Sequence, residues 1–318
     1  MTATPRTAVL LMAYGTPRHR DELLAYYTDI RRGRPPSAQQ LADLAARYEA
    51  IGGLSPLADR TAAQRDALQA MLDTTSPGEF EVVLGLKHAA PRIESAVDDV
   101  VGRRFSRLVG LVAAPHYSGS SVGQYLSRAR EAAHRHGVAF VGIESWATER
   151  ALVDFTAAQV VAKLATLPEN SKVLFTGHSL PQRIIDEGDR YPDELRATAA
   201  AVAGAAGLRH WNQWALAWQS ASRTPEPWLG PDILGVIDEL AAAENDANAT
   251  RGVLVCALGF VADHLEVLYD VDVLAAARAK SHGLAFARTA CVNDDASVMA
   301  ALAARVILAT DQFPSEAA

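Results

Sequence analysis

The stretch Lys172-Val-Leu-Phe-Thr-Gly-His178-Ser-Leu-Pro181 decides the fold of this chain. Residues 172–175 are a short apolar run with branched and aromatic side chains, which is typical of a buried strand. We expect Thr176 and Gly177 to break the strand, so that His178 stands where it ends, with Pro181 at a helix entry. In an open parallel sheet, ligands bind at the carboxyl ends of the strands. A histidine there either binds a metal or moves a proton, or is simply hydrogen-bonded at the strand end.

A second stretch, Gly259-Phe-Val-Ala-Asp263-His264-Leu-Glu266-Val-Leu-Tyr-Asp270, also follows an apolar run. Glu266 and Asp270 are four residues apart and share a helix face, and Asp263 lies three residues before Glu266 on the same side. One interpretation is a solvated acidic helix start that the helix dipole favours. The other is a mostly buried helix, because its background is apolar, and a carboxylate within it then needs a partner.

One imidazole and one carboxylate, His178 and Glu266, suit a divalent first-row metal such as iron or zinc. The sequence has no HExxH or CxxC spacing, so a fixed structural or hydrolytic zinc site is not favoured. Two protein ligands leave most coordination positions open. Such a pair is poor at holding a metal permanently and well suited to passing one on.

Strands alternate with helices along the whole chain, which predicts an α/β fold with a parallel sheet in each half and helices on both faces. A weak internal repeat relates the halves, and we expect domains at 1–148 and 149–318 with a cleft between their strand ends. The predicted strands are 8–13, 81–87, 107–114, 139–146, 172–175, 214–218, 252–258 and 284–289. The predicted helices are 21–30, 37–51, 59–72, 92–100, 123–134, 151–165, 192–206, 233–243, 265–279 and 296–309.

Composition narrows the class of protein. The chain has 318 residues and a formal net charge of −7, which argues against a general nucleic-acid binder. Its two cysteines cannot build a disulfide scaffold or a four-thiolate cluster and are most simply buried thiols. The first residues carry no apolar signal core, and no apolar run approaches the length of a membrane span. We therefore expect a reduced, cytoplasmic protein.

A basic loop, Arg31-Arg32-Gly-Arg34, follows the first predicted helix. It is either a solvated basic face or a clamp for ligand carboxylates or phosphates, with which guanidinium groups pair bidentately. Arg47-Tyr48 and Ser55 could extend the clamp. The sequence shows no P-loop and no dinucleotide-binding motif, and a histidine stands where a hydrolase nucleophile elbow would have its serine.

Seven collinear motifs make the chain resemble the ferrochelatase family, and the match runs from about Ala8 to Asp272. They are Met12-Ala-Tyr-Gly-Thr-Pro17, Tyr27-Thr-Asp-Ile-Arg-Arg-Gly-Arg34, Arg47-Tyr-Glu-Ala-Ile-Gly-Gly-Leu-Ser-Pro56, Gly85-Leu-Lys-His88, Phe175-Thr-Gly-His-Ser-Leu-Pro181, Thr224-Pro-Glu-Pro-Trp-Leu-Gly-Pro-Asp232 and residues 259–270. The first motif and Ala114-Pro-His-Tyr-Ser118 are most similar to the soluble enzymes of Gram-positive bacteria, which insert ferrous iron into coproporphyrin III.

The resemblance implies two similar Rossmann-like, chelatase-type domains and a lyase of haem and porphyrin biosynthesis. It makes His178 and Glu266 the catalytic and metal-handling pair, and Tyr14 the residue near the metal on the opposite porphyrin face. The residues that it places around the macrocycle, its propionates or the cleft are Arg31, Arg47, Tyr48, Ser55, Lys87, His88 and Tyr125.

The resemblance also bears on metals and cofactors. It implies ferrous iron as a substrate and no permanently bound cofactor. Some relatives carry an outer metal site along the row that Glu266 and Asp270 begin, but Leu274 stands where they have a further acid. Many actinobacterial relatives add cysteines that bind a two-iron, two-sulfur [2Fe-2S] cluster; Cys256 and Cys291 cannot supply it, so none is expected.

Three functions remain open beside coproporphyrin insertion. They are iron insertion into protoporphyrin IX, cobalt insertion into sirohydrochlorin, and non-catalytic carriage of a porphyrin or haem. For an enzyme, binding of a bent macrocycle exposes the pyrrole nitrogens, and His178 and Glu266 are candidates to take their protons or carry iron in. We expect a monomer without nucleic-acid partners or stable membrane insertion.

Overall fold

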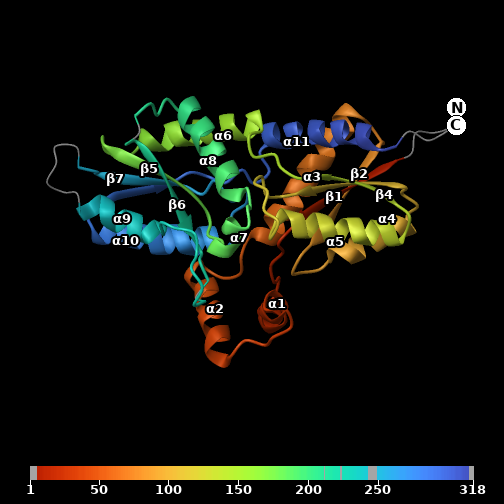
Figure 1. Ribbon diagram of the computed structural model, residues 1–318, viewed down its shortest axis with the longest axis horizontal. Helices are drawn as coiled ribbons and strands as arrows, with labels where there is room; N and C mark the ends of the chain where they lie inside the picture. The colour runs from red at the N-terminus through yellow and green to blue at the C-terminus, as the bar shows by residue number, and fades with distance from the viewer. Residues whose placement is uncertain (1–5, 211, 223, 243–248, 315–318) are drawn as a thin grey trace. The chain divides into compact units, whose positions relative to one another are not determined.

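The computed structural model describes residues 6–210, 212–222, 224–242 and 249–314, which form two compact units (Figure 1). The first unit consists of the described parts of 1–45, 54–146 and 293–318. The second consists of the described parts of 46–53 and 147–292. The units are therefore not two continuous halves of the sequence. The chain passes from the first unit to the second after Trp146, but the first unit also contains the described part of 293–318 and the second also contains residues 46–53.

The first unit is built on a four-stranded parallel sheet with the order β2-β1-β3-β4. Its strands are β1 (Thr7–Ala13), β2 (Phe80–Leu86), β3 (Arg107–Val112) and β4 (Ala139–Ile143). All seven residues of β1 are buried. A strand covered on both faces is apolar throughout, which is why the sequence predicted these strands as apolar runs without alternation.

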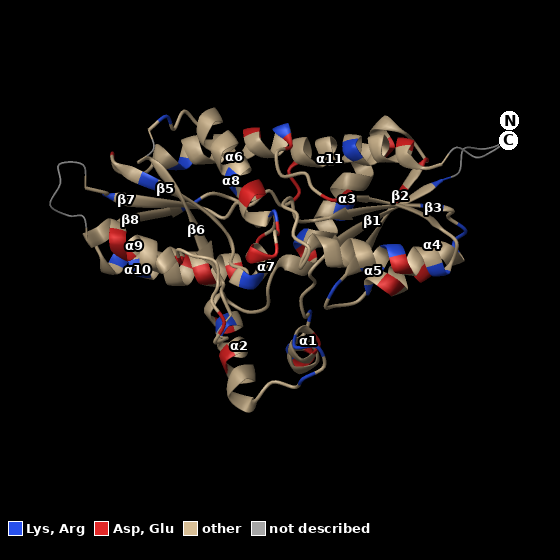
Figure 2. Cartoon of the chain, in the orientation of Figure 1, with Lys and Arg blue, Asp and Glu red and all other residues tan. Residues whose placement is uncertain are grey.

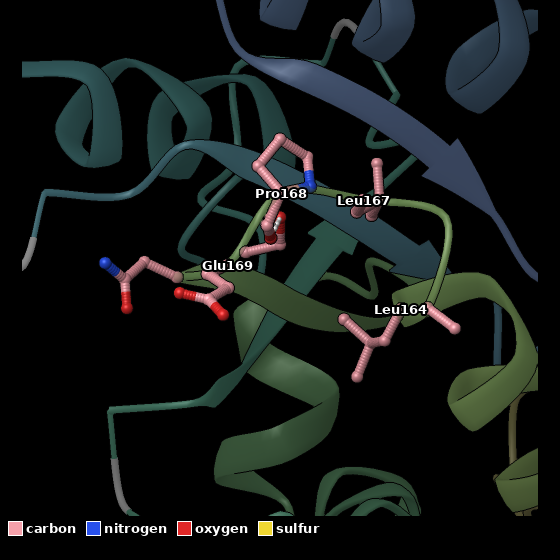
Figure 3. Close-up of a pocket in the computed structure, with 7 residues that line it drawn as sticks. Leu164, Leu167, Pro168 and Glu169 are labelled. Atoms are coloured by element: carbon pink, nitrogen blue, oxygen red, sulfur yellow. Dashed lines mark hydrogen bonds between the residues drawn. The ribbon is translucent and has the colours of Figure 1, made fainter.

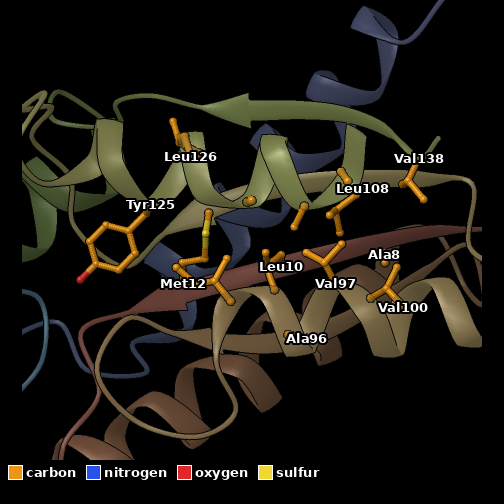
Figure 4. Close-up of a cluster of buried hydrophobic side chains, with 14 of the residues drawn as sticks. Ala8, Leu10, Met12, Ala96, Val97, Val100, Leu108, Tyr125, Leu126 and Val138 are labelled. Atoms are coloured by element: carbon orange, nitrogen blue, oxygen red, sulfur yellow. The ribbon is translucent and has the colours of Figure 1, made fainter. Parts of the chain in front are cut away.

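Helices cover both faces of the first sheet. Helices α4 (Ile93–Gly102) and α5 (Val122–Arg135) pack on the face that Leu10 and Met12 present, and their side chains form one core (Figure 4). Helices α3 (Leu57–Thr75) and α11 (Ala296–Ala309) pack against each other beside the sheet (Figure 1). The remaining described helices of this unit are the turn η1 (Arg20–Glu22), α1 (Leu23–Ile30), most of α2 (Ala38–Ala50) and the turn η3 (Thr310–Gln312).

The second unit repeats the plan with a parallel sheet of order β6-β5-β7-β8. Its strands are β5 (Ser171–His178), β6 (Trp214–Gln219), β7 (Gly252–Cys256) and β8 (Ala285–Arg288). Helices α6 (Arg150–Leu164) and α8 (Tyr191–Ala205) pack on one face. Helices α9 (Ile233–Ala242), η2 (Val267–Ala275) and α10 (Ala276–Ser281) pack on the other, and the short α7 (Gln182–Asp186) follows Pro181. The predicted α/β fold with two four-stranded parallel sheets is confirmed.

The prediction that Thr176 and Gly177 break the strand is wrong, because β5 runs through both residues to His178. A Cβ atom on Gly177 would lie 2.7 Å from the Tyr191 hydroxyl oxygen and 2.8 Å from a methyl carbon of Leu195. The glycine therefore reflects the close approach of α8 to the strand and not a turn.

The predicted helix 265–279 is confirmed, but most of it is η2, a π-helix that becomes α-helical only in α10. The fully buried residues of η2 are Val267, Val271 and Ala275, which recur every four positions. A π-helix has a wider turn than an α-helix and is often found at functional sites. The wider turn sets the spacing of the acidic side chains that η2 carries.

Charged residues lie mostly on helices and loops, whereas the strands carry few of them (Figure 2). Both cysteines, Cys256 and Cys291, are buried free thiols, as expected, and burial raises the pKa of each thiol. No helix among the described residues is both long and apolar enough to span a bilayer.

Candidate active site

His178 is the last residue of β5, and its imidazole is fixed by the chain itself. The ring atom Nδ1 lies 2.5 Å from the carbonyl oxygen of Ser179. Because a carbonyl can only accept, Nδ1 carries the proton and donates it. In the neutral ring the lone pair therefore resides on Nε2, which lies 3.7 Å from Oε1 of Glu266. This arrangement leaves Nε2 available to a metal ion or a proton.

Glu266 lies between two histidines. Its second oxygen, Oε2, is 3.7 Å from Nε2 of His264, whose Nδ1 lies 2.9 Å from the carbonyl oxygen of Ala262. The ring of Phe260 packs against both imidazoles, with centroid distances of 6.5 Å to His178 and 4.7 Å to His264. His264 was not predicted as a site residue, although it stands two positions before Glu266 in the same acidic run. The site is thus one carboxylate flanked by two imidazoles.

The Glu266 carboxyl is held in its ionised form. Burial alone would raise its pKa, but the imidazoles of His178 and His264 outweigh burial and, with the Arg47 guanidinium, lower the pKa to about 2. The side chain nevertheless keeps 37% of its surface exposed, so a ligand can reach it. Glu266 is therefore a charged and accessible carboxylate at neutral pH.

Asp270 lies one turn of η2 beyond Glu266 and behaves differently. Burial raises the pKa of this carboxyl, and the neighbouring Glu266 charge adds to the effect, while a hydrogen bond from Ser220 opposes it. Ser220 holds a left-handed backbone conformation with φ 63°, which costs a non-glycine residue free energy that the surrounding structure must offset. Asp263, which the sequence grouped with Glu266, instead pairs with Arg288 at 3.2 Å.

Two predicted substrate-binding residues belong to the second unit. The guanidinium carbon of Arg47 lies 5.4 Å from the centre of the Tyr269 ring on η2, within the range of a cation–π contact. Arg47 also contributes to the low pKa of Glu266. Tyr48 beside it is buried. The end of α2 therefore brings a positive charge to the acidic row.

The other predicted residues belong to the first unit, where four lie together beyond the ends of β1 and β2. The backbone N–H of His88 donates to the Tyr14 carbonyl oxygen at 2.9 Å, and the two rings pack with centroids 4.5 Å apart. Lys87 donates from Nζ to Oε1 of Gln124 at 2.8 Å and lies 5.1 Å from the centre of the Tyr125 ring. The structure brings these four predicted residues together.

Lys87 and His88 both have lowered pKa values. Burial lowers the pKa of the Lys87 amine to about 8, and the nearby positive charges of Arg128 and Arg32 add to the effect. Burial also lowers the pKa of His88, although a hydrogen bond to Asp29 works in the opposite direction. At neutral pH the ammonium remains mostly charged and the imidazole is neutral.

Arg31 and Ser55 make contacts with residues close to them in the sequence. The Arg31 guanidinium carbon lies 5.6 Å from the centre of the Tyr27 ring, and its Nε donates to the Arg34 carbonyl oxygen at 3.2 Å. Ser55 is buried, and its hydroxyl oxygen accepts a hydrogen bond from the backbone N–H of Leu57 at 3.2 Å. Arg32 and Arg34 are exposed. The basic loop is a cationic surface on which ligand carboxylates can bind.

A cavity of about 370 Å³ lies elsewhere, in the loop that enters β5 (Figure 3). Its lining includes Leu164, Leu167, Pro168 and Glu169 and contains none of the predicted site residues. This loop precedes the amino end of β5, whereas His178 lies at the carboxyl end. In parallel sheets the carboxyl end is the one that carries ligands, so the cavity is not the active site.

Two structural features bear on metal binding. The donors His178 and Glu266 are held from different elements, β5 and the start of η2. Across the ranges that the structure describes, no three His, Cys, Asp or Glu side chains are grouped so that they could hold a metal ion. The acidic row of η2 also lacks a third acid, because Leu274 occupies the next position and is partly exposed.

The chain is similar to known chelatases along nearly its whole length. The sequence model of the family described as ferrochelatase matches residues 6–309. A coproporphyrin III ferrochelatase of Geobacillus kaustophilus is 41% identical over 305 residues, covering 94% of each chain. Another from Halalkalibacterium halodurans is 43% identical over 271 residues, 84% of this chain and 85% of that one. A ferrochelatase of Herpetosiphon aurantiacus is 40% identical over 297 residues, 91% of this chain and 94% of the relative.

A solved structure shares the fold at low sequence identity. SirB from Bacillus subtilis, determined with Fe3+, superposes with a TM-score of 0.56 and 12% identity, covering 97% of this chain and 98% of that one. At this identity the likeness shows the fold alone and nothing of the substrate. The match of the family model over residues 6–309 and the relatives of about 40% identity together show that the chain belongs to the ferrochelatase family.

Proposed function

We propose that this ferrochelatase inserts ferrous iron into coproporphyrin III and releases Fe-coproporphyrin III, in the cytoplasm and as a monomer. The observation that carries the proposal is the His178–Glu266 pair at 3.7 Å, with the proton of His178 held on Nδ1. The substrate is inferred from the relatives named coproporphyrin III ferrochelatase, which are about 40% identical over most of this chain.

The chemistry that this pair would perform follows from its protonation. Insertion requires a porphyrin to lose two pyrrole protons while ferrous iron approaches the ring nitrogens. Nε2 of His178 has a lone pair that accepts a proton or binds iron, and the ionised Glu266 attracts the cation. His264, on the other side of Glu266, is a second imidazole that could accept a proton. Iron is a substrate here, and its remaining ligands are the porphyrin nitrogens.

We also propose roles for the residues that would bind the macrocycle. The cations Arg31, Arg47 and Lys87 would pair with propionate carboxylates, which suits a substrate with four of them. The aromatic residues Tyr14, Tyr48 and Tyr125, together with His88 and Ser55, would contact the ring or its edge. Tyr14 would face the metal from the side opposite His178. No permanently bound cofactor and no [2Fe-2S] cluster is part of this proposal.

The test is anaerobic insertion of ferrous iron, followed by visible absorbance, with coproporphyrin III and protoporphyrin IX in parallel. We expect rapid turnover of the first and little of the second. Preference for protoporphyrin IX would support iron insertion as the reaction but would disprove coproporphyrin III as the substrate. Tight binding of a porphyrin without turnover of either substrate would show that the protein is a porphyrin carrier and not an enzyme.

The variant His178→Ala tests the site. General acid–base groups contribute about 10²–10⁴-fold, so we expect turnover to fall by at least about 100-fold while porphyrin affinity stays within about threefold. His282→Ala is the matched control, because His282 is a surface histidine that pairs with Asp238 at 2.8 Å and should keep wild-type turnover. Wild-type turnover by His178→Ala would disprove the assignment.

A further inference from the structure

Asp29 is a carboxylate of α1 that the proposed chemistry does not use, yet it is tied to a site residue. Its Oδ2 atom lies 2.6 Å from Nδ1 of His88, a residue 59 positions further along the chain. A carboxylate that faces an imidazole nitrogen at this distance accepts a hydrogen bond from its N–H and fixes both the tautomer and the plane of the ring. Nδ1 of His88 therefore carries a proton, and the ring is held at one edge.

A second group holds Asp29 in turn. Arg92 donates to both Asp29 oxygens, at 2.9 Å to Oδ2 and 2.8 Å to Oδ1, and also hydrogen-bonds the carbonyl oxygen of Lys87. The hydrogen bond from Arg92 lowers the pKa of Asp29 to about 2, so the acceptor stays ionised. The carboxylate is therefore a fixed anchor and not a mobile surface group.

His88 transmits this fixed position to Tyr14. The His88 backbone N–H donates to the Tyr14 carbonyl oxygen at 2.9 Å, and the ring centroids lie 4.5 Å apart with planes at 55°. Tyr14 keeps 40% of its surface exposed, and the His88 ring packs against the phenol. The imidazole therefore contributes to the orientation of the phenol beside it.

We propose that Asp29 is a positioning residue that acts through His88 to orient the Tyr14 ring toward the metal face of the porphyrin. This inference rests on the proposed function for the role of Tyr14. Without its acceptor at Nδ1, the His88 ring loses the hydrogen bond that fixes its plane, and the surface against which the Tyr14 ring packs changes. A small misplacement of a group that faces the reacting atoms lowers the rate of the chemical step more than substrate affinity.

The test compares Asp29→Ala with Asp29→Asn. We expect Asp29→Ala to lower kcat for iron insertion about tenfold with KM for coproporphyrin III within about twofold. Asp29→Asn keeps an oxygen acceptor for Nδ1–H and should recover kcat to within about threefold of wild type. The matched control is Asp98→Ala, because Asp98 pairs with the exposed His136 at 2.8 Å in the same unit and should keep wild-type kcat.

A double-mutant cycle shows whether Asp29 acts through His88. The variants His88→Ala and Asp29→Ala/His88→Ala should have the same kcat, because the carboxylate has nothing left to orient. The proposal would be overturned if the loss of kcat in the double variant equalled the product of the losses in the two single variants. Identical kcat values for Asp29→Ala and Asp98→Ala would overturn it as well.

A spectrum gives a readout that does not depend on turnover. Added ferric coproporphyrin III reports the ligands and surroundings of its iron through visible absorbance. We expect Asp29→Ala to shift the spectrum of the bound complex in the same direction as Tyr14→Phe, and Asp98→Ala to leave it unchanged. A wild-type protein without insertion activity would refute the proposed function alone, while an Asp29→Ala spectrum identical to wild type would refute this inference alone.

Discussion

At the scale of the residue, Lys87 shows how burial changes what a common side chain can do. A lysine normally stays charged to about pH 10.5, but partial burial and two neighbouring arginines lower this amine's pKa to about 8. It is therefore the predicted propionate-binding residue whose charge changes just above neutral pH. Its hydrogen bond to Gln124 can form with either protonation state, whereas its cation–π contact with Tyr125 needs the charged ammonium.

Coproporphyrin binding should weaken as the pH rises through the pKa of Lys87. Below pH 8 the Lys87 amine is protonated and attracts carboxylates, and above pH 8 it becomes neutral, while the propionates stay ionised throughout. We expect the Kd measured by fluorescence quenching to rise about tenfold between pH 7 and pH 9, as the loss of one charged interaction implies.

Lys87→Met should bind equally weakly at both pH values, because it carries no amine. Lys163→Met, a change at an exposed position of α6, should keep the wild-type dependence on pH. If the Kd of Lys87→Met still rose with pH as in the wild type, the group that titrates would be a residue other than Lys87.

The paired residues of the site could be predicted from the sequence only where each stands in a recognisable local pattern. His178 follows an apolar run and Glu266 lies in an acidic run, so each was visible from its own neighbours. The contact between Asp29 and His88 joins residues 59 positions apart, and no local pattern connects them. His264 was visible in the sequence, but only its distance to Glu266 shows what it does.

At the scale of the element, the predicted strands are close to the observed ones because covered parallel strands have a simple pattern. The predicted run 81–87 corresponds to β2 and the run 284–289 to β8, each within one or two residues at its ends. The π-helix η2 could not be predicted in the same way. Over nine residues, apolar positions spaced by four fit an α-helix and a π-helix equally well, and only the backbone hydrogen bonds distinguish them.

The end of β5 and the segment after β7 meet through two glycines. A Cβ atom on Gly259 would lie 2.8 Å from the Cα atom of Gly177 and 3.1 Å from the Tyr191 hydroxyl oxygen. The Tyr191 hydroxyl also hydrogen-bonds the backbone of His178, and burial raises the pKa of this phenol. Close approach of the two backbones therefore sets the distance between the segments that carry His178 and Glu266.

We predict that Gly259→Ala pushes these segments apart. The added methyl group meets backbone atoms that cannot move aside, so the free energy of unfolding should fall by about 1–3 kcal/mol, and iron insertion should fall at least about tenfold. Circular dichroism during thermal unfolding measures the first effect, and the absorbance assay measures the second.

Gly235→Ala is the control, because a Cβ atom at that position of α9 meets nothing within 4 Å. That change should raise the free energy of unfolding by up to about 1 kcal/mol through helix propensity and leave turnover unchanged. Equal stability of the two variants would show that the backbones can yield at Gly259.

At the scale of the whole molecule, the chain crosses between its two units more than once. Helix α11 follows the entire second unit in sequence, yet it packs on α3 and beside β4 in the first. The helix 296–309 was predicted correctly, but the predicted boundaries placed it in the second domain, 149–318, whereas it packs in the first unit. Its apolar face is suited to either sheet, and only long-range packing selects between them.

We predict that one buried leucine of α11 stabilises the first unit. Leu302 is 3% exposed and Leu308 is 65% exposed on the same helix. Leu302→Ala leaves a cavity and should lower the free energy of unfolding by about 2–5 kcal/mol, whereas Leu308→Ala should change it by about 0.5 kcal/mol or less.

Hydrogen exchange measured by mass spectrometry then locates the effect. Exchange in Leu302→Ala should increase in β1 and α3 and stay unchanged in β5 and β7. Equal loss of protection in both sheets would mean that α11 stabilises the molecule as a whole and not the first unit in particular.

The late position of α11 in the sequence has a consequence for folding on the ribosome. Every segment of the second unit precedes residue 293, so the strands and helices that hold His178 and Glu266 leave the ribosome before α11 does. The sheet of the first unit is made earlier but waits for one of its covering helices until the ribosome has released residues 296–309. Until then an apolar surface beside β3 and β4 stays open to chaperones and to other nascent chains. The unit whose sheet is translated first is therefore the unit whose last covering helix is translated last.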